Sequence, residues 1–171
     1  MKRHKGYHQK KTGPSSVVSH KEAMKIIFLE VHGTLLLPIC HGVSRLLQKP
    51  LVGFKPSVEN LNFIVRGTGA ELVVLSGPDN NLIDNLQTKF GDWGLTKTSF
   101  DRVPIADKKG HAIIKWMAIA GEPESFVILE SKAKDYGRML WPYLIVADKE
   151  AGITEAMAKK AIKILNQKGK K

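Results

Sequence analysis

The apolar stretch at residues 26–31 constrains the fold of this chain more than any other part of the sequence. It reads Ile-Ile-Phe-Leu-Glu-Val, which favours a β-strand, and Gly33 and Thr34 follow shortly afterwards and end the strand. Because nearly all of its side chains are apolar, we expect this strand to be buried at the centre of a parallel sheet. Glu30 and His32 would then lie at its carboxyl end, where open α/β sheets bind their ligands.

Three further apolar runs are expected to form strands of the same sheet. They are residues 71–76, 125–131 and 142–147. Helices with apolar side chains at helical spacing are expected between and after them. These helices begin near Pro56, Asp79 or Asn80, Lys108 or Lys109, and Thr154. The alternation predicts an α/β three-layer sandwich with a Rossmann-like, mostly parallel sheet of about five strands. The strand at 26–31 is expected between those at 72–75 and 127–129.

Residues 36–55 connect the first strand to the first of these helices. Pro38, Gly42, Pro50 and Gly53 interrupt this segment. Proline and glycine break regular structure, so we expect no more than a turn of helix or a short hairpin here.

The polar residues near the strand ends occur in a characteristic order along the chain. They are Glu30 and His32, then Ser76, then Lys108 or Lys109 before a helix, then Glu130 and Ser131. This order resembles the four motifs of the haloacid dehalogenase (HAD) superfamily of phosphohydrolases. Residues 148–154 are similar to the ending of the small HAD domains that accompany RNA-repair enzymes. The resemblance covers residues 24–166 and implies an uncapped HAD-like fold, because residues 36–55 leave no space for an inserted cap domain.

The resemblance also implies a role for each of these residues. In the family, the first acid attacks phosphorus and the second acts as general acid and base. The Ser and Lys hold the phosphoryl group, and the last acids bind Mg²⁺ together with the first. The implied catalytic residues are Glu30, His32, Ser76 and Lys109, with Lys108 as the alternative to Lys109. Glu30 and Glu130 are the implied metal ligands.

Three positions depart from the family pattern. Glu30 and His32 stand where the family has two aspartates, and Ser131 stands where it has an acid. Catalytic residues act as a unit, so three changes at one site favour a non-catalytic protein without a cofactor. We therefore expect a degenerate HAD-like module that binds or regulates a partner.

The altered site has a structural and a catalytic interpretation. In the structural one, His32 is a polar residue at a strand end and Glu130 pairs with Lys108 or Lys109. In the catalytic one, the protein is a Mg²⁺-dependent phosphohydrolase that acts on an exposed phosphate, such as a nucleic-acid end. Glu30 would be its nucleophile and His32 its acid and base.

The net charge of +11 is concentrated at the two ends of the chain. Residues 1–21 contain six basic residues and no acidic one, and residues 155–171 contain six lysines and one glutamate, whereas the segment between them is balanced. Basic arms bind polyanions through counterion release, so we expect nucleic acid or an acidic protein surface as the partner, with solvated tails as the alternative. The expected nucleic-acid-binding residues are Lys2, Arg3, Lys5, Lys10, Lys11, Lys168, Lys170 and Lys171.

The predicted organisation is a basic, disordered arm at residues 1–21, a HAD-like domain at 22–166 and a basic tail at 167–171. Cys40 is the single cysteine, and no apolar run approaches the roughly 20 residues that span a bilayer. We expect a cytoplasmic protein that does not enter a membrane. The sequence leaves its oligomeric state open.

Overall fold

A parallel sheet with five strands forms the centre of the molecule. The structure, a computed structural model, describes residues 24–77 and 85–167. The strands are β1 (Lys25–Leu29), β2 (Glu71–Ser76), β3 (Phe100–Pro104), β4 (Ser125–Glu130) and β5 (Leu144–Val146). Their order across the sheet is β3-β2-β1-β4-β5, and all neighbours are parallel. The predicted fold class is confirmed, and so is the central position of β1 between β2 and β4.

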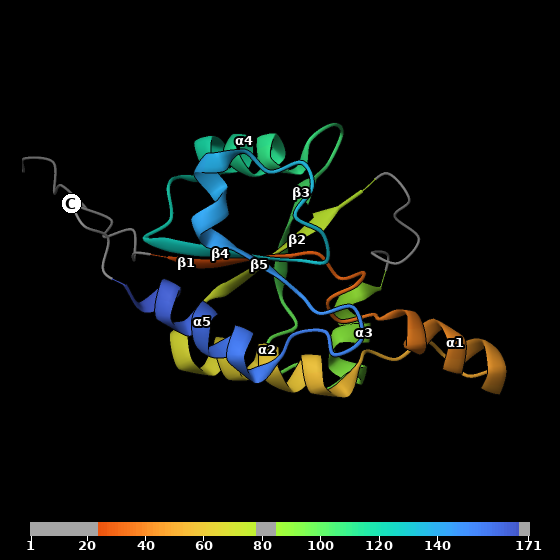
Figure 1. The fold of residues 1–171 in the computed structure, drawn as a ribbon. Helices are drawn as coiled ribbons and strands as arrows, with labels where there is room; N and C mark the ends of the chain where they lie inside the picture. The colour runs from red at the N-terminus through yellow and green to blue at the C-terminus, as the bar shows by residue number, and fades with distance from the viewer. Residues whose placement is uncertain (1–23, 78–84, 168–171) are drawn as a thin grey trace, which may run out of the picture.

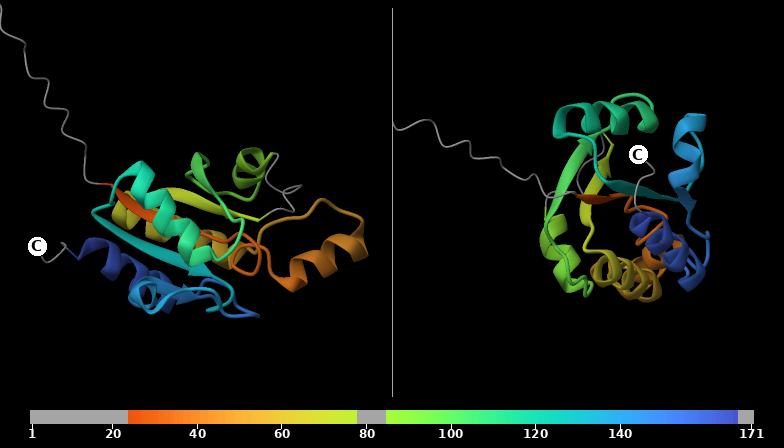
Figure 2. Two further views of the ribbon diagram at one scale, coloured as in Figure 1. Left: turned by 90° about the horizontal axis from the view of Figure 1, so that it is seen from above. Right: turned by 90° about the vertical axis from the view of Figure 1, so that its left-hand side faces the viewer.

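Helices cover both faces of this sheet (Figure 1; Figure 2, right). One face packs on α2 (Lys55–Thr68), α3 (Leu86–Asp92) and α5 (Glu155–Asn166). The other packs on α4 (Lys109–Ala120) and the 3₁₀ helix η2 (Arg138–Tyr143). Successive side chains of a strand point to opposite faces, so β1 sends Ile27 and Leu29 to the first layer and Ile26 and Phe28 to the second. Thr154 caps α5 as predicted, because its side chain accepts a hydrogen bond from the Met157 amide.

The connection after β1 differs from the prediction. A helix of 10 residues, α1 (Pro38–Leu47), occupies much of residues 36–55, where only a turn of helix or a hairpin was expected. Pro38 does not interrupt α1, because it lies in the first turn, where its missing N–H is not needed. Gly42 lies inside the helix, and a Cβ at this position would meet nothing outside the helix within 4 Å. Figure 1 shows α1 projecting from the edge of the sheet at which β1 ends.

Two other elements were predicted incompletely. The edge strand β3 was not recognised as a strand, and the last strand begins at Leu144 rather than at residue 142, because η2 extends to Tyr143. The expected helix start at Asp79 or Asn80 lies outside the described residues, as do nearly all of the predicted arm and tail. No helix in the described parts of the chain is long and apolar enough to cross a membrane.

Candidate functional site

Two glutamates lie side by side at the carboxyl edge of the sheet. Leu29 of β1 is paired with Leu129 of β4, and the next residues in each chain are Glu30 and Glu130. The Glu30 amide donates a hydrogen bond to the Leu129 carbonyl at 3.0 Å, which extends the pairing to this position. Side chains two residues apart in a strand point to the same face, so Glu30 and Glu130 point to the same side as Phe28 and Ile128, which face the layer of α4. The sheet therefore directs two carboxylates toward the first turn of that helix.

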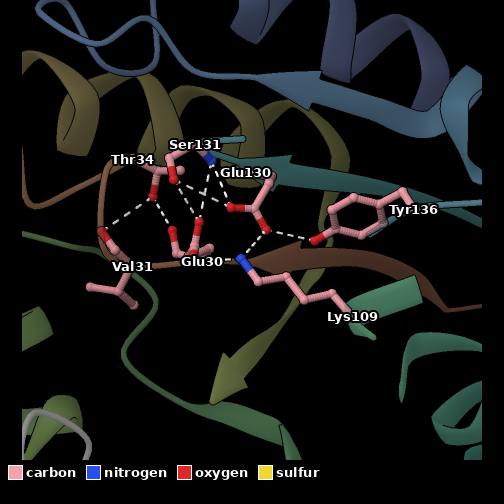
Figure 3. A network of polar contacts seen from close by, with 7 residues as sticks. All are labelled: Glu30, Val31, Thr34, Lys109, Glu130, Ser131 and Tyr136. Atoms are coloured by element: carbon pink, nitrogen blue, oxygen red, sulfur yellow. Dashed lines mark hydrogen bonds and ion pairs between the residues drawn. The ribbon is translucent and has the colours of Figure 1, made fainter. Parts of the chain in front are cut away.

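Lys109, the first residue of α4, connects the two carboxylates (Figure 3). Its Nζ lies 2.7 Å from Glu30 Oε1 and 2.8 Å from Glu130 Oε2. The Glu130 side chain is fully buried, and those of Glu30 and Lys109 are 20% and 23% exposed. Water and salt screen such an arrangement much less than a surface ion pair. The ammonium thus balances one of two negative charges at a largely buried position.

Ser131 bonds to the two remaining carboxylate oxygens, and Tyr136 adds a second bond to an oxygen that Lys109 already contacts. The Ser131 hydroxyl lies 2.8 Å from Glu30 Oε2, and its amide donates to Glu130 Oε1 at 2.9 Å. The Tyr136 hydroxyl donates to Glu130 Oε2 at 2.6 Å. Burial raises the pKa of Tyr136 far above its usual range, and the negative charges of Glu30 and Asp135 raise it further, so the phenol remains a donor. Each of the four carboxylate oxygens has a partner.

Two glycines allow the backbone to approach this cluster closely. Gly33 has a φ of 79°, and a Cβ there would lie 2.3 Å from the Cβ of Ser131. Gly110 lets the start of α4 approach the loop before η2, where a Cβ would lie 3.1 Å from the Asp135 carbonyl oxygen. The Thr34 hydroxyl also donates to the Glu30 carbonyl and fixes the turn that follows β1.

The other predicted site residues do not join the cluster. His32 is exposed, and its ring stacks on that of His41 in α1 with centroids 6.0 Å apart. Burial of part of the ring lowers the pKa of His32, as does the nearby His41, whereas Glu30 opposes the change. Lys108 is exposed and precedes α4 as its N-cap residue, without a side-chain capping bond.

Ser76 lies on β2, the strand that pairs with β1 on the side away from β4. It is buried at the end of β2, and its carbonyl accepts a hydrogen bond from the Ile105 amide. The structure thus brings together Glu30, Glu130 and Lys109, but not His32, Ser76 or Lys108. The basic residues predicted to bind nucleic acid lie outside the described ranges.

The arrangement does not fit a bound Mg²⁺. An ammonium lies within 2.8 Å of both carboxylates, at the position where a cation would contact them. Within residues 24–77 and 85–167, no group of three or more His, Cys, Asp or Glu side chains could hold a metal. Mg²⁺ requires an octahedral set of oxygen ligands, and two carboxylates already bonded to Lys109, Ser131 and Tyr136 provide a poor one.

Sequence reasoning did not identify the contributions of Ser131 and Tyr136 as donors. Ser131 was considered only as the replacement of an acid, although its hydroxyl and amide both bond to the acidic pair. Tyr136 lies in a loop, where no periodicity shows which way a side chain points. The only sign in the sequence that Tyr136 could contact Glu130 was that the two residues are six positions apart.

Comparison with known proteins gives no match to this chain, whether against protein-family models, curated proteins or solved structures.

Proposed function

We propose that this protein is a non-catalytic, HAD-like binding module. At its former catalytic edge, Lys109 occupies the position between the two carboxylates. The observation that carries the proposal is the position of the Lys109 ammonium, 2.7 Å and 2.8 Å from the two carboxylates. An opposite charge and good hydrogen bonds are what two acids in a buried site require. The lysine provides both without a metal.

The geometry around Glu30 also favours this function over phosphoryl transfer. Lys109 and Ser131 each bond to one of its carboxylate oxygens, and these bonds stabilise the carboxylate and make it a weaker nucleophile toward phosphorus. Glutamate is one methylene longer than the aspartate of the family, and a displacement of about 1 Å can cost roughly a hundredfold in rate. The ring of His32 stacks on that of His41, and within the described residues no hydrogen bond ties it to the cluster, as the orientation of a general acid would require.

The proposed partner of this module is nucleic acid, bound through the basic ends of the chain. The segment between the ends is electrically balanced, so the excess charge is carried by residues 1–21 and 155–171. Neutralised phosphates release their counterions, which gives such arms affinity without sequence preference. The arms supply affinity in this proposal, and the folded body supplies a surface for further contacts.

A turnover assay separates this proposal from the hydrolase alternative. Oligonucleotides with a 5′ or a 3′ phosphate are incubated with the full chain and Mg²⁺, and released phosphate is measured beside nucleic-acid binding. We expect no release above background, and unchanged binding in the Glu30→Gln variant. Release of phosphate by the wild-type chain that Glu30→Gln abolishes would establish the hydrolase instead.

A further inference from the structure

Helix α1 presents an apolar face that the rest of the described chain does not cover. None of its 10 residues is buried. Ile39 is 59% exposed, Val43 48%, Leu46 82% and Leu47 54%. A helix of this length is marginal in water by itself, and most helices are stabilised by packing an apolar face. Four exposed apolar side chains on one short helix indicate a contact surface.

The apolar face of α1 forms one wall of a groove. The hollow has a volume of about 330 Å³ and lies between α1 and residues 49–55. Its apolar lining includes Ile39, Val43, Val52 and Phe54. This volume is at the lower end of the range of small-molecule pockets and can accept one large side chain of a partner.

Hydrogen bonds fix the end of α1 and the wall formed by residues 49–55. The Ser44 hydroxyl donates to the Lys49 carbonyl at 2.6 Å, and the Lys49 amide donates to the Ser44 carbonyl at 3.1 Å. The Phe54 amide donates to the Leu35 carbonyl at 2.7 Å, and Trp93 Nε1 donates to the Leu51 carbonyl at 3.2 Å. The wall formed by residues 49–55 is therefore preformed, which lowers the entropic cost of binding.

The charges around the groove select its occupant. Residues 31–58 contain Arg45, Lys49 and Lys55 but no Asp or Glu. Lys49 and Lys55 belong to the lining. Glu59 lies 3.8 Å from Lys55, but both side chains are exposed, and such a pair contributes little. A partner with carboxylates beside an apolar anchor is complementary to this surface.

Two other occupants fit the surface less well. A second copy docked through the same face would bring Arg45, Lys49 and Lys55 of both copies together, and like charges at an interface are repulsive. An anionic membrane would meet the charges but is flat, whereas Ile39, Val43 and Val52 line a hollow. We propose that the groove between α1 and residues 49–55 binds an acidic peptide segment of a partner protein. An aliphatic or aromatic side chain of that segment fills the hollow, and its carboxylates pair with Lys49 and Lys55.

Selection from a displayed library of random 12-residue peptides tests this proposal on the full chain. We expect enrichment of peptides that combine a large apolar residue with flanking Asp or Glu. In the Val43→Asp variant, their affinity should fall about tenfold or more, because the anchor pocket is lost and a like charge is added. The matched control is Ile119→Asp, which places the same change at a 79% exposed position of α4. That variant should bind as the wild type does.

Each other outcome would overturn the proposal. Absence of enrichment, or enrichment of peptides without acidic residues, would show that the groove does not bind an acidic peptide segment. Equal loss, or no loss, in the two variants would place the binding on the basic arms rather than on the groove. Sedimentation showing a dimer that Val43→Asp dissociates would assign the face to a second copy. Binding to phosphatidylglycerol vesicles that Val43→Asp abolishes, without peptide enrichment, would assign it to a membrane. The test does not depend on whether the carboxyl edge of the sheet is catalytic.

Discussion

At the scale of single residues, Lys109 determines the chemical character of the carboxyl edge. It bonds to Glu30 and to the fully buried Glu130, which would otherwise place two negative charges beside each other. A buried pair of this kind contributes little net stability compared with apolar residues, yet removing one partner is strongly destabilising. The contribution of Lys109 to stability is therefore best measured by substituting it.

The first prediction compares two neighbouring lysines. Lys109→Ala should lower the free energy of unfolding by about 3 kcal/mol, because it leaves two carboxylates without a cation. Lys108→Ala should change it by less than about 0.5 kcal/mol, because that side chain is exposed and outside the cluster. Urea denaturation at neutral pH measures both. Equal effects of the two substitutions would show that the ion pairs do not hold the edge together.

The second prediction concerns His32 and pH. Its pKa in the folded protein is lowered by burial and by His41, so the unfolded state binds the proton more readily. This contribution to stability is complete above the unfolded pKa and is lost as the pH falls through that value toward the folded pKa. From about pH 7 to about pH 5, His32→Gln should therefore lose less stability than the wild type. His111→Gln, on the exposed surface of α4, is the control and should follow the wild type. Parallel curves for all three proteins would contradict the assignment.

At the scale of secondary structure, the sequence was informative where burial produces a regular pattern. The strands β1, β2 and β4 are continuous apolar runs and were located within about two residues, the usual uncertainty of element ends. The edge strand β3 was missed, because Asp101, Arg102 and Pro104 leave it no such run. Helix α1 was missed because Pro38 and Gly42 were given more weight than the spacing of its apolar residues.

The candidate site was predictable to the same degree. Glu30 and Glu130 directly follow apolar strand residues, so their meeting at one edge of the sheet could be predicted from the chain order. The pairing of Glu130 with a lysine was also anticipated, with Lys108 and Lys109 left as alternatives. The choice between them depends on the rotation of α4 about its axis, which two adjacent sequence positions do not reveal. Tyr136 depends on a loop conformation and could not be placed.

The third prediction concerns the stability of α1 itself. Its amides should exchange with solvent through local opening that costs about 1 kcal/mol or less, because no side chain of the helix is buried. Amides of α2, which buries Val58, Leu61 and Ile64, should require roughly 5 kcal/mol or more. Hydrogen exchange followed by mass spectrometry or NMR resolves the two helices. Equal protection would mean that the apolar face of α1 is already covered in the free protein.

At the scale of the whole molecule, the excess positive charge is concentrated at the two ends of the chain. The five strands lie in the segment between residues 22 and 154, whose charges balance, whereas the excess lies in residues 1–21 and 155–171 and includes Lys159, Lys160 and Lys163 of α5. The body can therefore keep its structure while the arms meet a polyanion. This distribution of charge makes the contribution of the arms measurable by truncation.

The fourth prediction uses that distribution of charge. Nucleic-acid affinity of the full chain should fall steeply and log-linearly with salt, because each neutralised phosphate releases about one counterion. A fragment of residues 19–166 should bind more weakly and with a flatter slope, although it retains the whole sheet. Fluorescence anisotropy over a salt series measures both slopes. Equal affinities and slopes would show that the arms are solvated tails.

The central claim is that Lys109 takes the place of a metal at the carboxyl edge, and a calorimetric titration of the wild-type chain with Mg²⁺ tests it most directly. We predict no saturable heat up to about millimolar Mg²⁺, because the carboxylate oxygens already have partners and Mg²⁺ is reluctant to lose its water. Binding with a low-micromolar dissociation constant that Glu130→Gln abolishes, and that the exposed control Glu150→Gln preserves, would contradict the claim.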